Sequence, residues 1–512
     1  MSSSLGRASR EAAVRTMQSE VLDLLVVGAG ATGTGTALDA ASRGLSVGLI
    51  DKGDIASGTS SKSSQLVHGG LRYLQQGNVA LVRESLRERK LLLTTLAPHL
   101  VRPLAFMLPL KHRVWERLYV GAGLLAYDVI GGAGAVPRHR HVSKRGALAR
   151  FPDLRPDALI GALQYYDAQM DDARLAVAIA RTAAREGAHV APHTSLVGRL
   201  SDELQGVHRV VVRDELSGDE YVVSARTVAL CVGVWAPEVS SVFTESDNAV
   251  GIIRSKGVHL RLPRSAIDGS TALIVPTGKS VLFVLPSPTH WLVGTTDTEW
   301  MGDPDAVEPT QEDIDYLLGL LNAVVRRPVT ADDVTYTFAG LRPLVRDQSV
   351  GGNTAKVTRE HRIVRVAPGV LAIVGGKWTT YRVMARDLVD TVLAESGEHP
   401  RPCRTQLLPL VGSAGEAEAG IAELAARDPE LAQPLADAPG YTRADVAYAC
   451  TDEGAYRLSD VIDRRLRLGI NLDAVPDSTV RAVAEVMGSV LGWDEARVER
   501  EIDGYSVSHV PL

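Results

Sequence analysis

Residues 24–51, LLVVGAGATGTGTALDAASRGLSVGLID, constrain the fold of this chain more than any other stretch. They open on an apolar run that is typical of a strand buried on both faces, and this run ends in the pattern Gly28-x-Gly30-x-x-Gly33. An Ala-rich segment compatible with a helix follows, and a second apolar strand leads to Asp51. This order of strand, turn, helix and strand is the context in which a GxGxxG pattern indicates a nucleotide site.

Each motif residue has a physical task in binding an adenine dinucleotide. Gly28 makes the tight turn, Gly30 leaves room for a pyrophosphate, and Gly33 lets the helix pack against the strand. The N-terminus of that helix attracts the anion. Asp51 is placed to accept hydrogen bonds from ribose hydroxyls, and its charge would repel a 2′-phosphate, which argues against NADP. The motif alone leaves NAD and FAD as alternatives.

Composition excludes several other classes of function. The net charge of −6 over 512 residues gives no basic footprint for nucleic acid, so none is expected as a partner. The three cysteines, Cys231, Cys403 and Cys450, are too widely spaced for a zinc site or a disulfide framework. We therefore expect no metal, and we expect buried cysteines in a reducing compartment.

Two segments bear on targeting and on membranes. Residues 1–20 carry several charged side chains without an apolar core, so we predict a mobile extension rather than a secretory signal. No run has the roughly 18 uncharged apolar residues that a membrane-spanning helix needs. The nearest, 118–130, has arginines on both sides, and two interpretations stay open: an ordinary core helix, or a surface that touches anionic lipid.

The rest of the chain can be divided into segments by its local sequence patterns. Helical spacing indicates helices at 78–96 and 171–186, whereas short strand-like runs alternate with turns between 190 and 330. A buried strand at 371–376 ends in Gly-Gly, and a helix is predicted directly after it. Residues 397–404 have the composition of a linker, and mostly short helices follow.

The segment after Asp51 favours FAD over NAD. An NAD enzyme usually continues with further strand–helix units of its nucleotide sheet, but here residues 53–74 are GDIASGTSSKSSQLVHGGLRYL. Gly69 and Gly70 would let a flat ring approach the main chain. The same run supplies hydroxyl groups for a cofactor, among them those of Ser60, Ser61 and Ser64.

In these stretches the chain resembles the FAD-dependent glycerol-3-phosphate dehydrogenase family. The likeness begins with Asp23–Asp51 and SSKSSQLVHGGLRYL, and it continues in order over about residues 20–385. It includes the blocks YYDAQMDDARL (165–175), SKGVHL (255–260), GTTDTEW (294–300), FAGLRPL (338–344), KVTREH (356–361) and GGKWTTYR (375–382). VIDRRLRLG at 461–469 resembles the helical cap of the family. Several ordered blocks are far more specific than one glycine motif.

The resemblance implies a fold of the class α/β plus α+β, with FAD as the cofactor. A glutathione-reductase-like FAD domain of the amino-acid-oxidase type is expected over 21–400. This domain would be discontinuous, with a β-rich substrate domain inserted at about 96–155 and 241–330. A C-terminal helical domain is expected at 401–512.

The reaction that the resemblance implies is the oxidation of sn-glycerol 3-phosphate to dihydroxyacetone phosphate, with a hydride passing from C2 to the flavin N5. A phosphate dianion needs fixed cationic donors, and the planar fork of arginine suits it best. Arg342 and Arg359 match substrate-binding positions of the family, and Arg72 is a third candidate. Tyr73 would close the pocket or donate a hydrogen bond.

Flavin contacts and the general base are also assigned by resemblance. Lys377 would stabilise the negative charge of a reduced flavin. For the base that takes the hydroxyl proton we predict His259 first, with Arg342 as the alternative. The residues expected to contact the flavin are His68, Gly375, Gly376, Lys377 and Thr379.

Other functions stay open at this point. They are an oxidase acting on the same substrate with O₂, another oxidase of the amino-acid-oxidase superfamily, and a flavin-binding protein without turnover. The family usually passes its electrons to a membrane quinone. We therefore expect a quinone and an anionic membrane surface as partners, with peripheral attachment at the cytoplasmic face of the cell membrane through the segment at 113–127. We also expect a homodimer.

Overall fold

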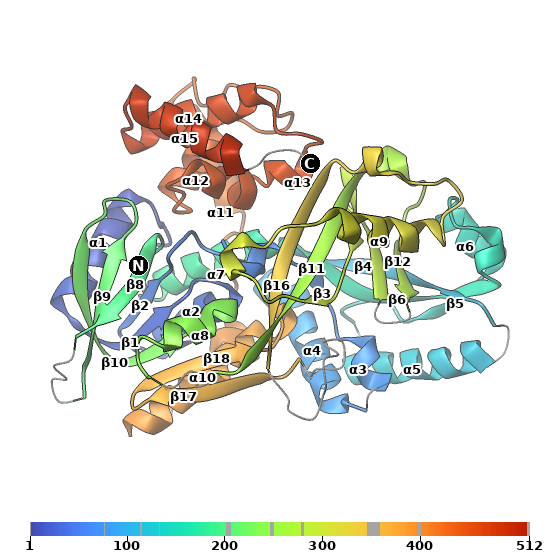
Figure 1. Cartoon of the computed structure of the whole chain (residues 1–512), viewed down its shortest axis with the longest axis horizontal. Coiled ribbons are helices and arrows are strands. Elements are labelled where there is room, and N and C mark those ends of the chain that lie inside the picture. Colours follow the sequence, from blue (N-terminus) through green and yellow to red (C-terminus); the bar gives the residue numbers. More distant parts are fainter. Residues whose placement is uncertain are drawn as a thin grey trace. The chain divides into compact units, whose positions relative to one another are not determined.

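The structure is a computed structural model that describes residues 2–75, 77–112, 115–132, 134–200, 206–245, 250–277, 281–345, 359–397 and 401–508. Its contacts divide the chain into two units, each assembled from separate stretches of sequence (Figure 1). Unit 1 comprises Met1–Ser61, Asp172–Ile252 and His361–Leu512, and unit 2 comprises Lys62–Asp171 and Ile253–Glu360.

The sheet of unit 1 has the strand order β17-β18-β10-β1-β2-β7, and β8 and β9 extend it from β10. β1 runs parallel to β10 on one side and to β2 on the other, so the two predicted strands of residues 24–51 lie at the centre. The strands are β1 (Val21–Val27), β2 (Val47–Ile50), β7 (His189–Ala191), β8 (Thr194–Arg199), β9 (His208–Asp214), β10 (Glu220–Leu230), β17 (His361–Ala367) and β18 (Val370–Gly375).

Helix α2 packs against both α7 and α10 in unit 1. Its face is made of small residues, and a Cβ at Gly35 would lie 2.8 Å from the ring of Tyr381. The helices around this sheet are α1 (Arg7–Ser19), α2 (Ala31–Ser42), α7 (Asp172–Arg185), α8 (Ala236–Ser240) and α10 (Tyr381–Ser396).

The C-terminal residues form a helical domain with an apolar core of its own. Their contacts place them in unit 1, together with the nucleotide sheet. The helices are α11 (Glu416–Arg427), α12 (Arg443–Thr451), α13 (Leu468–Asn471), α14 (Asp477–Leu491) and α15 (Glu495–Ser508), and a π-helical turn spans Asp460–Arg465.

Unit 2 is built on a mixed sheet with the order β15-β11-β14-β13-β12-β4-β6-β3, to which β16 adds at β11 and β5 at β6. The strands are β3 (Leu66–Val67), β4 (Val101–Leu110), β5 (Arg140–Ser143), β6 (Gly161–Met170), β11 (Ile252–Pro263), β12 (Ala272–Pro276), β13 (Val281–Pro286), β14 (His290–Gly294), β15 (Thr298–Glu299) and β16 (Tyr336–Val345). The helices are α3 (Leu71–Gln75), α4 (Val79–Leu91), α5 (Trp115–Gly131), α6 (Lys144–Arg150) and α9 (Gln311–Asn322).

The parts of the chain inserted into unit 1 are Lys62–Asp171 and Ile253–Glu360, whereas 96–155 and 241–330 were predicted. The first part starts earlier and ends later than predicted, and the second is shifted toward the C-terminus, because β3 pairs with β6 and β16 pairs with β11 in the same sheet. These boundaries depend on pairing between strands that are far apart in the sequence, and local sequence patterns do not predict such pairing.

The prediction of a mobile extension at 1–20 is wrong for most of that segment. Residues 7–19 form α1, which packs against β7 and β10 and buries Arg10, Ala13 and Met17. The Arg10 guanidinium donates to both carboxylate oxygens of Asp214, at 2.8 and 3.0 Å. The three buried residues recur at positions i, i+3 and i+7, which is the spacing of one helix face. This spacing indicates a helix with one buried face, but the many charged residues of the segment suggest exposure instead.

Among the helices of the described ranges, none combines the length and the apolar character needed to cross a bilayer. Helix α5 covers the predicted 118–130 segment. Gly121, Leu124 and Tyr127 of this helix are buried and its opposite face is exposed, so it is not a fully buried core helix. Contact with anionic lipid stays a prediction.

Candidate active site

The dinucleotide turn of unit 1 has the geometry that the glycine motif predicts. Gly28 has a φ of +101°, and a Cβ there would lie 2.6 Å from the carbonyl oxygen of Cys231. A Cβ at Gly33 would lie 1.7 Å from the carbonyl oxygen of Gly28. Neither distance is compatible with a side chain, so strand, turn and helix pack closely only with glycine at both positions.

The N-terminus of α2 is the expected anion site. Gly30 is its N-cap residue, and the backbone N–H of Ala31 donates to Ser60 Oγ at 2.9 Å. Ser60 lies on the 3₁₀ turn Thr59–Ser61, and Ser61 is half-buried beside it. The positive end of the helix dipole and the serine hydroxyl therefore meet at the position where a pyrophosphate is expected.

Asp51 lies at the end of β2, as the ribose contact requires. Its carboxylate accepts from the backbone N–H of Ala29 at 2.6 Å and from that of Gly53 at 2.8 Å. Burial raises the pKa of Asp51, although these two N–H groups act in the opposite direction. A carboxylate oxygen accepts more than one hydrogen bond, so the site retains capacity for ribose hydroxyls.

The Gly375–Thr379 turn reaches the same serine. Gly375 and Gly376 have φ values of +77° and +76°, which turn the chain sharply after β18. Lys377 precedes the 3₁₀ turn Trp378–Thr380, in which Thr379 is buried. The indole Nε1–H of Trp378 donates to the carbonyl oxygen of Ser60 at 2.9 Å. Unit 1 thus joins two predicted cofactor segments that are far apart in sequence.

In unit 2, Arg342 lies on β16 and reaches β11. Its guanidinium donates to Thr295 Oγ1 at 2.8 Å and to Ser255 Oγ at 3.3 Å. A Cβ at Gly257 would lie 2.2 Å from Arg342 Nη2, so this glycine makes the space that the guanidinium fills. Hydrogen bonds and packing therefore hold the fork in one place.

Arg342 and Arg359 face one carboxylate. Arg342 Nη1 lies 4.0 Å from Asp297 Oδ1, and Arg359 Nη2 lies 3.9 Å from Asp297 Oδ2. Two guanidinium groups around a single carboxylate leave a net positive charge in a partly buried place. Such a place attracts a dianion.

His259 lies on β11 opposite Gly294 of β14, whose missing Cβ leaves room for the imidazole ring. The ring stacks on Phe338 with centroids 4.9 Å apart, and Nε2 lies 2.8 Å from Ser64 Oγ. Burial, with the charge of Arg342, lowers the pKa of His259 to about 3. Within the described ranges, Nδ1 of this ring is buried without a hydrogen-bond partner. The imidazole is therefore neutral, and its Nδ1 is left with a free lone pair that can accept a hydrogen bond.

The turn after β3 differs from the expectation in one respect. The space beside Gly69 holds the side chains of Leu86 and Tyr127, and the space beside Gly70 holds the ring of Tyr73. These glycines therefore admit the protein's own side chains. The Gly69 N–H donates to the Tyr127 hydroxyl oxygen at 2.8 Å, which fixes the turn. Flavin contacts of His68, Gly69 and Gly70, and the substrate role of Tyr73, stay predictions.

Two assignments fall outside what is described. The side chain of Arg72 lies outside the described side chains, and residues 356–358 of the KVTREH block lie outside the described ranges. The sequence-based reasoning also missed residues that form the site: Ser255, Gly257, Gly294, Thr295 and Asp297. All five lie in blocks quoted above, SKGVHL and GTTDTEW, and membership of those blocks is the signal that could have found them.

Comparison with known proteins places this geometry in a family. The model described as "FAD dependent oxidoreductase" matches residues 23–391, and the model described as "C-terminal domain of alpha-glycerophosphate oxidase" matches residues 371–498. Together they confirm the predicted cofactor and the predicted fold class with a helical C-terminal domain.

Relatives extend over nearly the whole chain. Glycerol-3-phosphate dehydrogenase 2 of Mycobacterium tuberculosis (strain ATCC 25618 / H37Rv) is 42% identical over 531 residues, covering 98% of this chain and 90% of the relative. Glycerol-3-phosphate dehydrogenase of Mycobacterium leprae (strain TN) is 41% identical over 536 residues, with 98% and 91% covered. The crystal structure of glycerol-3-phosphate dehydrogenase from Bacillus halodurans complexed with FAD superposes with a TM-score of 0.77 at 26% identity, covering 99% of this chain and 97% of that one. This chain belongs to the FAD-dependent glycerol-3-phosphate dehydrogenase family.

Proposed function

We propose that this enzyme oxidises sn-glycerol 3-phosphate to dihydroxyacetone phosphate and passes the electrons to a membrane quinone. The observation that carries the substrate assignment is the pair of arginines, Arg342 and Arg359, around Asp297, with a neutral buried histidine in the same unit. An amino-acid oxidase has only a carboxylate to hold, for which one arginine suffices. Two arginines suit a phosphate dianion better.

FAD, when bound, supplies the acceptor for the hydride that leaves C2. Arg342 and Arg359 would hold the phosphate, with the fork of Arg342 already fixed by Thr295 and Ser255. His259 would accept the hydroxyl proton at Nδ1 while its Nε2–H donates to Ser64. The C2 alcohol thereby loses a hydride and a proton and becomes the ketone. Lys377 would stabilise the charge of the reduced cofactor.

Anaerobic titration of the purified holoenzyme with glycerol 3-phosphate tests the proposal. We expect stoichiometric loss of the oxidised flavin absorption with glycerol 3-phosphate and none with amino acids. A flavin that dithionite bleaches but glycerol 3-phosphate does not would refute the substrate assignment. Reoxidation by a soluble quinone in preference to O₂ would support a dehydrogenase, and the reverse preference would support the oxidase alternative.

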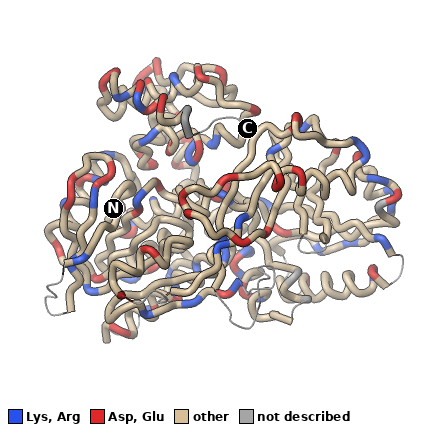
Figure 2. The backbone as a smooth tube through the Cα atoms, in the orientation of Figure 1, with Lys and Arg blue, Asp and Glu red and all other residues tan. Residues whose placement is uncertain are grey.

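Quinone as acceptor requires contact with a membrane, and α5 is the surface we assign to it. The exposed face carries large apolar side chains, while Figure 2 shows little charge along this helix. Lys111, Arg138 and Arg140 are exposed at neighbouring positions in the sequence, which suits anionic lipid headgroups. Attachment to the cytoplasmic face of the cell membrane follows as part of the proposal. The exposed residues of this face are Trp115, Leu118, Tyr119, Leu125 and Val129.

Two acidic substitutions on α5 should release the protein from membranes. Leu118 and Val129 are 69% and 72% exposed, and inserting them into lipid would remove both from water. We expect L118E/V129E to weaken binding to vesicles of phosphatidylglycerol and phosphatidylcholine by at least about 100-fold. Co-sedimentation measures this, with Leu407→Glu, which is 70% exposed on unit 1, as the matched control. Equal partitioning of both variants would refute a role for α5.

His259 can be tested by the pH dependence of flavin reduction. His259→Asn should slow reduction by glycerol 3-phosphate roughly 10²- to 10⁴-fold, because the proton acceptor is lost. With a pKa of about 3 in the folded protein, the histidine stays neutral as the pH falls through 6.5, so the wild-type rate should show no inflection near 6.5 from this group.

The same histidine makes the stability of the protein depend on pH. The unfolded chain binds the additional proton between 6.5 and about 3, so the free energy of unfolding should decrease as the pH falls through this window.

Anaerobic stopped-flow absorbance measures the rate, with exposed His141→Asn as the control. A His259→Asn rate within a few-fold of the wild type would leave Arg342 as the remaining candidate for the base.

A further inference from the structure

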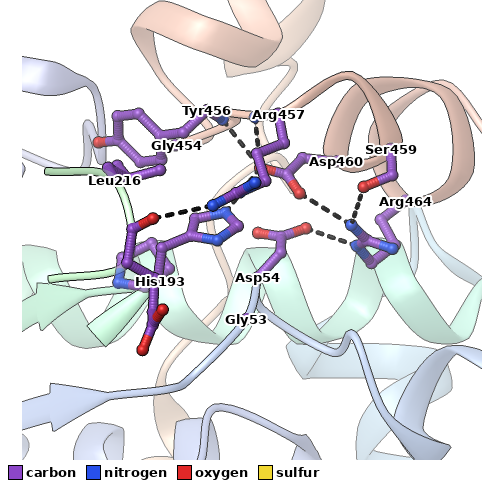
Figure 3. A network of polar contacts seen from close by, with 12 residues as sticks. Gly53, Asp54, His193, Leu216, Gly454, Tyr456, Arg457, Ser459, Asp460 and Arg464 are labelled. Atoms are coloured by element: carbon purple, nitrogen blue, oxygen red, sulfur yellow. Dashed lines mark hydrogen bonds and ion pairs between the residues drawn. The ribbon is translucent and has the colours of Figure 1, made fainter. Parts of the chain in front are cut away.

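Two arginines of the C-terminal domain bind a carboxylate in the turn that follows Asp51. Asp54 is buried, and its carboxylate accepts from Arg464 Nε at 2.6 Å and from Arg465 Nη1 and Nη2 at 2.7 Å each. Figure 3 shows Asp54 directed toward Arg464 from the loop that carries Gly53. Both arginines belong to the π-helical turn Asp460–Arg465, which lies in the VIDRRLRLG block. A bidentate and a monodentate arginine on one buried carboxylate fix it firmly.

A second buried carboxylate, that of Asp460, is bound by the same group of residues. His193 Nε2 lies 2.8 Å from Asp460 Oδ2, and the backbone N–H groups of Tyr456 and Arg457 donate to that oxygen at 2.9 Å (Figure 3). Arg464 Nη2 donates to the other oxygen of Asp460 at 2.8 Å. Burial opposes ionisation of Asp460, but His193 and the arginines hold the pKa of that carboxyl well below its usual range. We call Asp54, His193, Asp460, Arg464 and Arg465 the clamp.

The clamp is not a metal site. Ligand atoms of Asp54, His193 and Asp460 lie within 4.8 Å of one another, which is close enough for a shared ion. The two carboxylates are already neutralised by the guanidinium groups of Arg464 and Arg465. A cation placed among them would add charge where the charges are balanced.

Backbone hydrogen bonds connect the clamp to Asp51, the carboxylate predicted to bind the ribose. The Gly53 N–H donates to Asp51 Oδ1 at 2.8 Å, and the Gly53 carbonyl oxygen accepts from the N–H of His193 at 2.7 Å. The Thr194 N–H donates to the carbonyl oxygen of Asp51 at 2.6 Å. Asp51 is therefore held by Gly53, and Gly53 is next to Asp54 in the sequence and bonded to His193, both of which are clamp residues.

We propose that the clamp is a positioning device for FAD: the C-terminal domain holds Asp51 in place for the ribose and thereby retains the cofactor. This assigns a task in cofactor binding to Arg464 and Arg465, although none of the hydrogen bonds described above joins either of them to the glycine motif. It rests on the FAD site of the family and not on the proposed substrate. Linkage makes the effect reciprocal, so bound FAD must in turn stabilise the clamp.

The test measures FAD release from the full-length holoenzyme. Arg465→Met keeps an apolar stem of similar length to that of arginine but removes the guanidinium fork from Asp54, so Asp51 loses its rigid support. We expect the dissociation constant of FAD to increase about 5- to 150-fold, the usual size of coupling between two sites. Recovery of flavin fluorescence on dilution reports release. Arg481→Met is the matched control, because its pair with Glu499 is exposed in the same domain.

A purely structural role gives a different result. If Arg465→Met lowers the melting temperature but leaves FAD release at the wild-type rate, the proposal is overturned. Should Arg465→Met fail to fold, Arg465→Lys retains the charge without the fork and should still accelerate release. Hydrogen exchange on the wild type gives the reciprocal readout: residues 453–467 should exchange more slowly with FAD bound than after its removal, and equal exchange would overturn the proposal. Flavin bleaching by glycerol 3-phosphate is not used here, so this proposal and the proposed function fail independently.

Discussion

An Arg342→Met enzyme is expected to be reduced by glycerol 3-phosphate about 30- to 4,000-fold less efficiently than the wild type, which corresponds to about 2–5 kcal/mol for the loss of a hydrogen-bonded cation that holds an anion. Methionine keeps an apolar stem of similar length to that of arginine and lacks the guanidinium fork that Thr295, Ser255 and Gly257 hold in place. The second-order rate constant of flavin reduction, measured anaerobically by stopped flow, gives the magnitude.

Two comparisons make the Arg342 result specific for phosphate. Arg342→Lys should recover only part of the loss, because an ammonium cannot form the bidentate contact. Arg327→Met alters an arginine that is 56% exposed in the same unit and should match the wild type. Glycerol, which lacks the phosphate, should be oxidised by wild type and Arg342→Met with far more similar efficiency. An equal loss on glycerol and glycerol 3-phosphate would show that Arg342 does not bind phosphate.

A Gly33→Ala protein is expected to be purified without flavin. The added methyl group would lie 1.7 Å from the Gly28 carbonyl oxygen, and neither the Cβ, which is fixed by its own backbone, nor the backbone carbonyl can rotate aside. The turn must open, and the N-terminus of α2 then moves away from the pyrophosphate. We expect affinity for FAD to fall by at least about 100-fold. The ratio of flavin to protein absorbance after gel filtration measures occupancy.

The control for this variant is another helical glycine. Gly319 in α9 has open space where its Cβ would lie, so Gly319→Ala should retain full flavin content. Circular dichroism of both variants separates loss of the cofactor from loss of the fold. Full occupancy in Gly33→Ala would contradict the assignment of the dinucleotide turn.

Local patterns predicted those parts of the fold that depend on neighbours in sequence. The β1–α2–β2 unit is such a part, because its burial and its glycines are all visible between residues 24 and 51. The predicted helix at 78–96 is α4 followed by a π-helical turn at Leu92–Leu96, a change of hydrogen-bond pattern that apolar spacing does not report. The charges of the α1 segment suggested an exposed extension, because the sequence does not show that Arg10 pairs with Asp214, 204 positions away.

In the candidate site, too, some residues can be predicted from the sequence and others depend on contacts between distant strands. Arg342 and His259 carry chemistry in their side chains, so residue type and resemblance point to them. Gly257 and Gly294 contribute by leaving space, and that contribution exists only when β11, β14 and β16 lie in register, with His259 opposite Gly294. Asp297 looks like an ordinary surface acid in the sequence. Its role as the shared counter-ion of two arginines depends on contacts that the sequence pattern does not contain.

The contacts of the segment before α1 set an order of events during synthesis. The Leu5 N–H donates to the carbonyl oxygen of Asp452, and the Leu5 carbonyl oxygen accepts from the Tyr456 hydroxyl at 2.6 Å. A ribosome adds Leu5 to the chain 451 positions before Tyr456. During synthesis Leu5 therefore lacks these partners until Tyr456 has emerged, and the segment before α1 cannot complete its contacts earlier.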